Sequence, residues 1–397
     1  VDLGGAEDQA SADGAIPPDL RLPDGGGGGD GGPMGPKITE CPGASLPPLA
    51  DGICEVTAGG DDKLLTGTVL LPGEVLHGGQ VLVDAKGTIA CVACDCSAMA
   101  PQGSTKITCP RGVLSPGLIN THDHLNYTEN PPDKDTGERY EQRHDWRNGL
   151  RGHTRDPSGN TASADQMAWG ELRFLMAGAT SSVSSAAASG FVRNLDDARQ
   201  EGLNHPVVHF QTFPLGDSDG TQIASGCAYK FTDTTASIMN DKAYFPHIAE
   251  GIDVVARNEF LCASSTMNGG QDLTQPQSAF IHSAGLTAPD YALMAKESVT
   301  LVWSPRSNIR LYGNTAQVTA AARLGVLITL GTDWTQSGSM NLLRELRCAD
   351  DLNRLYYGKY FSDEELWLMA TYNGAVATAT DDAIGLLKVG HLADIAI

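Results

Sequence analysis

The chain has 397 residues, 41% of them hydrophobic, with a formal net charge of −21 and an isoelectric point near 4.7. The length suits one large domain with a smaller partner, because barrels of alternating strands and helices exceed 200 residues as a single unit. The negative charge disfavours nucleic acid as a partner, and no apolar run reaches the roughly 18 residues that a membrane span needs.

The first 37 residues contain the run PDGGGGGDGGPMGP and few apolar side chains. Such a segment buries too little apolar surface to offset the entropy of ordering, so residues 1–37 are predicted to form a disordered Gly/Asp-rich linker. The sequence begins with Val and has no charged and apolar leader. A tether ahead of a cysteine-rich segment favours an exported protein, periplasmic or lipid-anchored, over a cytoplasmic one.

Residues 38–115 read as a small β-domain, with β-like runs at 67–73, 78–94 and 106–117 separated by Gly and Pro. The six cysteines before position 110 favour disulfides. A structural zinc at the CxxC within CVACDC is the weaker reading, because no second CxxC or histidine pair follows at zinc-finger spacing. These six are Cys41, Cys54, Cys91, Cys94, Cys96 and Cys109.

From residue 116 onward, strand-like runs alternate with helical ones, which predicts parallel βα units and a (β/α)8 TIM-like barrel over residues 116–383. The helical segments include 163–178 and 287–298. The run at 225–231 is the weakest strand candidate and would supply the eighth. The other seven strand candidates are 117–122, 179–186, 206–213, 243–250, 278–284, 299–305 and 325–333.

A further helix is predicted at residues 362–375, where Ser362 and Glu365 have capping-box spacing. The closing run IGLLKVGHLADIAI, residues 384–397, is strand-like and stops without a terminal cap. We therefore expect the chain to end inside an element and to be part of a longer protein.

Two histidines one residue apart end the first barrel strand in PGLINTHDHL. Alternate residues of a strand share a face, so His122 and His124 would point the same way. Active sites of such barrels lie at the carboxyl ends of the strands. The pair is therefore interpreted as metal-binding rather than as two solvated side chains.

Three other strand-like runs end in residues of the same chemistry. His247 closes AYFPHIAE with Glu250 three residues later, and His282 closes SAFIHSA. Asp333 follows the most hydrophobic run, LITLGTD, where it could bind a metal and accept a proton; its alternative role is a helix N-cap. For Glu250 the alternative is a helix-start carboxylate.

This ordered set of motifs resembles the metal-dependent amidohydrolase superfamily, in its deaminase and triazine-hydrolase-like (chlorohydrolase-like) branch. The resemblance covers residues 60–397 and includes WSPRSNIRL and NGAVAT. It implies that residues 384–397, with GHLADIAI, return as a strand to complete a flanking small β-sandwich formed with the N-terminal segment. It also implies one divalent metal ion, with zinc favoured over iron, bound by His122, His124, His247 and Asp333.

The resemblance further implies hydrolysis of a C–N bond that is not a peptide bond, most plausibly deamination of a heterocyclic small molecule. A metal-activated water would be the nucleophile. Asp333, with His282, would take the proton of the water, and Glu250 would deliver a proton to the ring or the departing amine. Two alternatives stay open: an amide, cyclic-amide or dipeptide hydrolase, and a non-catalytic exported metal- or solute-binding protein.

The long insertion after the first strand, residues 126–153, is rich in Tyr, Trp, Arg and His, and long loops at this rim shape substrate sites. The alternative role of its candidate residues for substrate recognition is to form a packed polar lid. Asn308 in WSPRSNIRL has the alternative role of tying its own loop. Whether the protein forms a homo-oligomer stays open. The substrate-binding candidates are Arg143, His144, Trp146, Arg147, Arg306 and Asn308.

Overall fold

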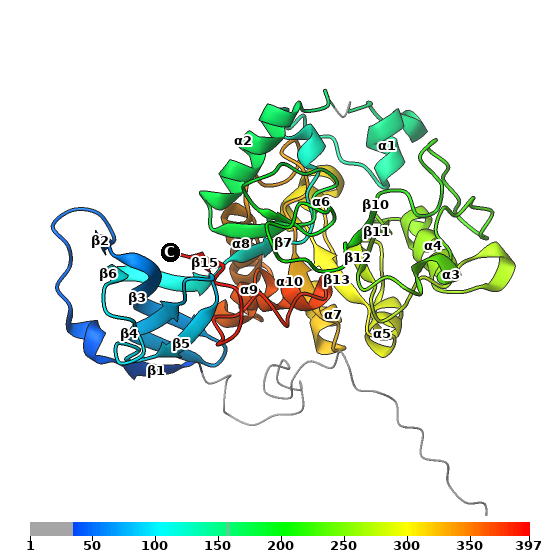
Figure 1. Cartoon of the computed structure of the whole chain (residues 1–397). Helices are drawn as coiled ribbons and strands as arrows, with labels where there is room; N and C mark the ends of the chain where they lie inside the picture. Colours follow the sequence, from blue (N-terminus) through cyan, green and yellow to red (C-terminus); the bar gives the residue numbers. More distant parts are fainter. Residues whose placement is uncertain (1–34, 157–158) are drawn as a thin grey trace, which may run out of the picture.

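The computed structural model describes residues 35–156 and 159–397 (Figure 1). The predicted linker falls mostly on residues 1–34, which lie outside this range. Its predicted end at residue 37 is one residue late, because Lys37 already pairs with Glu74 in the first sheet.

Seven strands make one sheet, in which the C-terminal strand joins six strands from residues 37–116. The path runs β1-β4-β3-β6-β15, while β2 pairs with β6 and β5 pairs with β4. The strand β15 pairs antiparallel with β6 through Ile395 and Pro116, beside the N-terminal strands in Figure 1. The strands are β1 (Lys37–Glu40), β2 (Glu55–Thr57), β3 (Gly60–Leu71), β4 (Glu74–Val83), β5 (Ile89–Ala93), β6 (Ser104–Pro116) and β15 (Ile395–Ala396).

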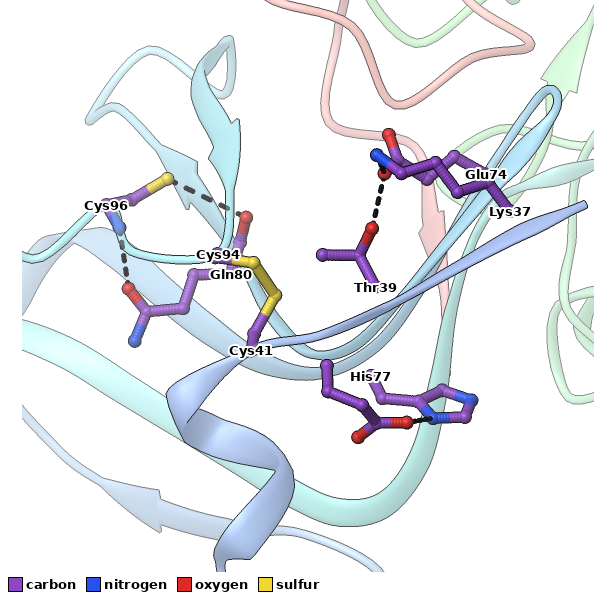
Figure 2. Close-up of a disulfide and its surroundings, with 9 residues drawn as sticks. Lys37, Thr39, Cys41, Glu74, His77, Gln80, Cys94 and Cys96 are labelled. Atoms are coloured by element: carbon purple, nitrogen blue, oxygen red, sulfur yellow. Dashed lines mark hydrogen bonds and ion pairs between the residues drawn. A yellow bond between two sulfur atoms is a disulfide. The ribbon is translucent and has the colours of Figure 1, made fainter.

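All six cysteines of this region form disulfides, which confirms the preference for disulfides over zinc. Figure 2 shows Cys41 of the segment after β1 bonded to Cys94 after β5, with the side-chain oxygen of Gln80 accepting the backbone N–H of Cys96. The two cysteines of the CxxC, Cys91 and Cys94, do not pair with each other, because Cys91 bonds to Cys96 and Cys94 bonds to Cys41. The pairs are Cys41–Cys94, Cys54–Cys109 and Cys91–Cys96.

Two parallel sheets, in the orders β7-β8-β9 and β10-β11-β12-β13-β14, carry the rest of the strands. Backbone hydrogen bonds link their edges on both sides. Thr121 donates to Leu330 at 3.2 Å, and Val208 donates to Leu195 at 2.8 Å. The strands are β7 (Leu118–Asn120), β8 (Ala179–Ser182), β9 (Arg193–Asn194), β10 (His209–Gln211), β11 (Tyr244–Ile248), β12 (Ala279–His282), β13 (Thr300–Trp303) and β14 (Ile328–Leu330).

Seven of the eight predicted barrel strands are present, and the eighth was placed wrongly. Residues 225–231 form no strand. The eighth strand is β9, which was not predicted and which pairs with β8. The disulfide Cys227–Cys262 fixes the 225–231 segment to α4 (Val254–Ala263). The side chain of Asn258 donates to the carbonyl of Gly226 at 2.8 Å, so a helix satisfies backbone groups that a strand would have paired.

Helices follow most of the strands, and those predicted at 163–178 and 287–298 are present as α2 and α5. The helix predicted at 362–375 starts with the capping box of Ser362 and Glu365 but is divided in two. The break frees the carbonyl of Ala370 to accept the N–H of Ile119 in β7 at 2.8 Å. The remaining helices are α1 (Arg143–Asn148), α2 (Ala164–Leu175), α3 (Thr235–Ile238), α5 (Ala288–Lys296), α6 (Pro305–Tyr312), α7 (Val318–Arg323), α8 (Leu342–Leu355), α9 (Asp363–Met369) and α10 (Tyr372–Ala377).

The strands β7, β11, β12, β13 and β14 are buried on both faces, as their continuous apolar runs require. In β12, Phe280 packs in one apolar cluster and its neighbour Ile281 in another, and β13 divides Leu301 and Val302 in the same way. Such strands leave little freedom for the side chains at their ends. Within residues 35–156 and 159–397, no helix is long and apolar enough to cross a membrane.

Candidate active site

Four strand ends bring imidazoles and a carboxylate to one place. His122 lies two residues after β7, His247 is inside β11, His282 is the last residue of β12, and Asp333 lies three residues after β14. All four are at most 3% exposed. Because the strands are parallel, their carboxyl ends meet on one side of the sheets, and residues more than 200 positions apart become neighbours.

The imidazole Nε2 atoms converge closely. Nε2 of His122 lies 3.1 Å from Nε2 of His247 and 3.3 Å from Nε2 of His124. The Oδ1 atom of Asp333 is 3.7 Å from the Nε2 atoms of both His122 and His124. His282 forms a further group with His122 and His247, in which one ring nitrogen of each residue lies within 4.8 Å of the others.

Hydrogen bonds at the opposite ring nitrogens orient two of these imidazoles. Nδ1 of His247 donates to the carbonyl of Gln211 at 3.2 Å, and Nδ1 of His122 lies 2.9 Å from the hydroxyl of Ser304. The bond of His247 leaves its Nε2 lone pair facing the cluster, because a carbonyl can only accept, and the contact of His122 does the same when its Nδ1 donates to Ser304. Metal-binding histidines are held in this way, with the second nitrogen bonded to a carbonyl or polar group.

The residues present fit a divalent metal ion. Two nitrogen ligands about 2.05 Å from one ion at a tetrahedral angle would be roughly 3.3 Å apart, close to the Nε2 separations seen here. Burial, followed by the neighbouring imidazoles, lowers the pKa of His122 and of His247 well below the ordinary value. Burial lowers the pKa of His124 to about 4. All three are thus neutral at pH 7, which is the form that binds a metal.

A chain of hydrogen bonds fixes the orientation of His282. The indole N–H of Trp303 donates to the hydroxyl of Thr315 at 2.8 Å, and that hydroxyl donates to Oδ1 of Asn308 at 3.1 Å. The amide nitrogen of Asn308 is therefore left to donate to Nδ1 of His282, at 2.9 Å. An indole can only donate, so the direction of the whole chain is set, and a neutral His282 carries its proton on Nε2.

Nε2 of His282 points towards the two carboxylates, 3.7 Å from Oε1 of Glu250 and 4.0 Å from Oδ2 of Asp333. His282 and Asp333 both have positive φ, 70° and 56°. Such conformations cost energy in residues other than glycine and are typical of functional sites. They aim both side chains at the same point.

Asp333 is a buried carboxylate with few compensating charges. Its Oδ2 accepts the hydroxyl of Ser307 at 2.6 Å and its Oδ1 accepts the backbone N–H of Trp334 at 2.9 Å. Burial raises the pKa of Asp333 well above the ordinary value, and the nearby Glu250 raises it further. A carboxyl group in this position is suited to accepting a proton.

Glu250 has the opposite electrostatic balance. Its Oε1 accepts the hydroxyl of Tyr312 at 2.7 Å, and its Oε2 is 3.8 Å from the guanidinium of Arg143. Burial alone would raise the pKa of Glu250, but His282 and Arg143 outweigh it and the pKa is lowered. The pKa values of these two neighbouring carboxyl groups are thus shifted in opposite directions.

Gly331 makes room for the cluster. A Cβ atom at this position would lie 2.3 Å from Cβ of His122 and 2.8 Å from its backbone nitrogen. Any side chain at 331 would therefore displace His122. The glycine of the LGTD motif is thus needed for close packing of β14 against the first histidine.

A cavity of about 220 Å³ opens beside the cluster. Glu250, His282 and Asp333 line it, together with aromatic, basic and polar side chains. The predicted candidates Arg143, Trp146 and Arg147 line it. The other lining residues are His124, Asn126, Tyr127, Ser185, Thr212, Phe213, His247 and Trp334.

Three predicted substrate contacts lie elsewhere. Arg306 points away from the cavity, with Nε donating to Ser339 at 2.9 Å. Asn308 lies outside the cavity lining, with its amide nitrogen bonded to His282 and its amide oxygen to Thr315. His144 is buried behind the wall, with Nε2 2.8 Å from Asp217. Each was predicted from its loop, but the direction of its side chain depends on partners distant in sequence.

Several residues of the site carried no usable signal in the sequence. Tyr312 reaches Glu250 from the last turn of α6, and Phe213 enters the wall after β10. Phe213 ends a predicted strand, which places it at the correct rim, but an aromatic residue there is more often core. Tyr312 sits on a helical face, where nothing local distinguishes it from a packing residue.

Comparisons with known proteins agree with this geometry. Residues 235–397 match the Amidohydrolase family. Over 122 residues, 30% of this chain, the sequence is 31% identical to the 5-methylthioadenosine/S-adenosylhomocysteine deaminase of Clostridium tetani, and over 119 residues it is 31% identical to that of Pyrococcus furiosus. The matched stretch spans 28% of the length of each relative.

Solved structures share the fold over most of the chain. An adenosine deaminase from Xanthomonas campestris with bound zinc has a TM-score of 0.55 at 18% identity, covering 91% of this chain and 84% of its own. A triazine hydrolase variant has a TM-score of 0.56 at 18% identity, covering 84% and 86%. The chain is thus similar to the Amidohydrolase family over residues 235–397, and it shares its fold with structures of an adenosine deaminase and a triazine hydrolase.

Proposed function

We propose that this protein is a metal-dependent hydrolase that releases ammonia from an aminated heterocycle. The observation that carries the proposal is the convergence of three imidazole Nε2 atoms and the carboxylate of Asp333 beside a cavity that Glu250 lines. The named relatives act on adenosine derivatives, which supports a purine-like ring, although each is matched over only 28% of its length.

The metal is proposed to be one zinc ion bound by His122, His124, His247 and Asp333. Neutral imidazoles with one carboxylate suit zinc, and iron accepts the same donors. A divalent ion held there would lower the pKa of a bound water and provide the nucleophile at neutral pH. His282, with its proton held on Nε2, stands beside this set as a hydrogen-bond donor.

Asp333 is proposed to be the proton acceptor of the reaction. Burial raises the pKa of Asp333, which makes its carboxylate a stronger base towards a proton of the attacking water. The hydroxyl of Ser307 and the backbone N–H of Trp334 hold its two oxygens apart and in place. His282 would then orient the oxygen that attacks the ring carbon.

Glu250 is proposed to pass a proton to a ring nitrogen and to regain one from the new hydroxyl group, while Asp333 passes the proton that it took from the water to the departing amine. The carboxyl group of Glu250 faces the cavity and lies within reach of His282. Tyr312 donates to Oε1 and so sets the rotamer of the carboxyl group. The ring carbon loses its amine as the proton arrives, which gives ammonia and the oxo heterocycle.

The test is a screen of aminated heterocycles and N-acyl compounds with metal-loaded protein, scored by ammonia. Glu250→Gln should lower the rate of ammonia release at least about 100-fold while the metal content is unchanged. Glu55→Gln, an exposed carboxylate on β2, is the matched control and should keep the rate.

Each alternative predicts a different result. Amide cleavage without ammonia from any ring would replace deamination by the amide, cyclic-amide or dipeptide hydrolase. Metal binding with no turnover, indifferent to Glu250→Gln, would favour the non-catalytic exported binding protein, which no comparison supports.

The fold and location are proposed on related grounds. Hydrogen bonds at both edges of the parallel sheets support one closed (β/α)8 barrel over residues 116–383. The pairing of β15 with β6 supports a flanking β-sandwich built from residues 38–115 and 384–397. Four disulfides favour an oxidising compartment, so we expect an exported protein.

A further inference from the structure

Three of the five tryptophans start hydrogen-bond chains that end on the three groups proposed to handle protons. An indole N–H can only donate, whereas the hydroxyl groups that link these chains can both donate and accept. The indole at the start therefore decides which way every bond of its chain points. The chains run from Trp146 to Glu250, from Trp303 to His282 and from Trp334 to Asp333.

The chain to Glu250 begins on the long insertion. Nε1 of Trp146 in α1 donates to the hydroxyl oxygen of Tyr312 at 3.0 Å, and this hydroxyl donates to Oε1 of Glu250 at 2.7 Å. A phenol has one proton, and because the indole donates to its oxygen, that proton goes to the carboxyl group. Oε1 is thus held as an acceptor. The proton that Glu250 exchanges in the reaction therefore belongs on Oε2.

The chain to Asp333 passes through two serines. Nε1 of Trp334 donates to the hydroxyl of Ser337 at 2.5 Å, and this hydroxyl lies 2.8 Å from that of Ser307. Ser307 in turn donates to Oδ2 of Asp333 at 2.6 Å. Each serine has one proton, so the indole makes Ser337 the donor to Ser307 and Ser307 the donor to the carboxylate. The contact between the two serines, which is ambiguous in isolation, has one direction here.

The chain from Trp303 to His282 follows the same rule through one hydroxyl and one amide. All the linking side chains are at most 7% exposed, so water does not compete for their bonds. A buried chain of hydroxyls without a donor-only end could reverse when the group at its other end gained a proton. The linking residues are Ser307, Asn308, Tyr312, Thr315 and Ser337.

We propose that Trp146, Trp303 and Trp334 are positioning residues, each of which keeps the hydrogen bonds of its chain pointing towards the reacting group while protons enter and leave the site. The proposal deepens the proposed function and rests on it. No proton of a chain is transferred. Each donor keeps its own proton, and the protons of the reaction exchange at the remaining positions of the same three groups.

A fourth tryptophan provides a matched control. Nε1 of Trp367 in α9 donates to the hydroxyl of Ser115 at 2.9 Å, and this hydroxyl donates to the carbonyl of Pro116 at 2.8 Å. The arrangement is again an indole followed by a hydroxyl, but it ends on the backbone of β6, and neither side chain lines the cavity. Its loss should leave the reaction unchanged.

The first test reads the tautomer of His282. Thr315→Val removes a hydroxyl with little change of shape and leaves Oδ1 of Asn308 without its donor. The amide can then turn over and accept from Nδ1 of His282. Nitrogen-15 NMR of the metal-depleted full chain should show Nε2–H for His282 in the wild type and Nδ1–H in Thr315→Val, with His282→Gln identifying the signal. Thr315→Ser keeps the hydroxyl and should restore the wild-type tautomer.

The second test asks whether Trp146 acts through Tyr312. Trp146→Phe keeps an aromatic ring in the cavity wall but loses the N–H, and it should lower kcat for ammonia release about fivefold with a smaller change in KM. Added to Tyr312→Phe, it should lower kcat little further, because both substitutions break the same chain. Trp367→Phe should change kcat less than about twofold. Thermal unfolding verifies that each variant is folded.

Two results would overturn the inference: a proton that stays on Nε2 of His282 in Thr315→Val, or losses of kcat that multiply in the double variant of Trp146 and Tyr312. Either result leaves the proposed deamination standing if the wild type releases ammonia. The proposed function fails separately, when no heterocycle yields ammonia. The NMR measurement needs neither metal nor turnover, so it still decides the inference if that happens or if Trp146→Phe does not fold.

Discussion

The sheet of β1–β6 and β15 and the parallel strands β7–β14 reach stability by different means. The sheet has a small apolar cluster around Val69 and Val81, and three disulfides tie its strands and loops together. The parallel strands contribute to two extended apolar clusters. The disulfide of this region, Cys227–Cys262, joins the 225–231 segment to α4. A small core needs covalent support, whereas a large one does not.

The same difference explains where the chemistry lies. Buried polar groups are costly and must be held by complete hydrogen-bond networks. The strand ends of the large core supply such networks. Examples are the hydrogen bonds that link Trp303 to His282 and the bond that His247 donates to the carbonyl of Gln211. In the sheet, polar side chains such as Lys37, Glu74 and His77 instead form surface pairs, as Figure 2 shows.

The largest effect is expected from removing a metal ligand, which lies in the region of the parallel strands and not in the sheet of β1–β6 and β15. His124→Ala should lower metal content and reduce ammonia release at least about 1,000-fold, because a lost ligand removes several kcal/mol of transition-state stabilisation. His209→Ala is the control, since His209 pairs with Asp241 at the start of β10, away from the cavity lining. Metal analysis and ammonia release are the measurements. Full activity with no metal bound would refute the metal site.

The next effect concerns the sheet. Replacing Cys54 and Cys109 with alanine should lower the free energy of unfolding by about 4 kcal/mol, since the bond closes a loop of 55 residues. Replacing Cys91 and Cys96, five residues apart, should cost roughly half as much. Denaturant unfolding measures both, and the ammonia rate should change less than twofold. A large loss of rate at unchanged stability would show that the two regions are coupled.

A third effect is the pH dependence of the large core. Burial raises the pKa of Glu345 in α8 to about 7, where it accepts the N–H of Arg306. The unfolded chain therefore loses this proton first, and the free energy of unfolding falls as the pH rises from about 4.5 to 7. Over that window the loss is about 3 kcal/mol.

Glu345→Gln removes this contribution, so its stability relative to the wild type should rise across the same window. Denaturant unfolding at pH 4.5, 6 and 8 gives the difference curve. Glu55→Gln on the exposed β2 is the control and should give a flat curve. A flat curve for Glu345→Gln as well would mean that Glu345 is ionised in the folded protein throughout.

The smallest effect concerns the positioning of Glu250. Tyr312→Phe removes one hydrogen bond to a charged group and should lower kcat about tenfold, with a smaller change in KM. Tyr356→Phe, at an exposed tyrosine of the same region, is the control. Steady-state ammonia kinetics distinguish the two. A change confined to KM would instead place Tyr312 in substrate binding.

The fold and the residues of the site could be predicted where the sequence pattern that marks them lies within one short stretch of the chain. His122, His247, His282 and Asp333 each end an apolar run, and parallel strands bring such ends together. The cysteines before position 110 indicated disulfides, but not which sulfurs pair. Strand β9 is only two residues long, too short for any pattern to reveal.

By itself, the sequence determined the alternation of strands and helices, the disulfide-rich β-region and the set of imidazoles and carboxylates at the strand ends, because periodicity and residue type are local properties. Only the tertiary structure decided which side chains turn inward. It directed Asn308 to His282, bonded Arg306 to Ser339, and placed Arg147 in the cavity lining beside Phe213. These outcomes depend on hydrogen-bond partners from distant segments, and no single stretch of sequence contains both halves of such a contact.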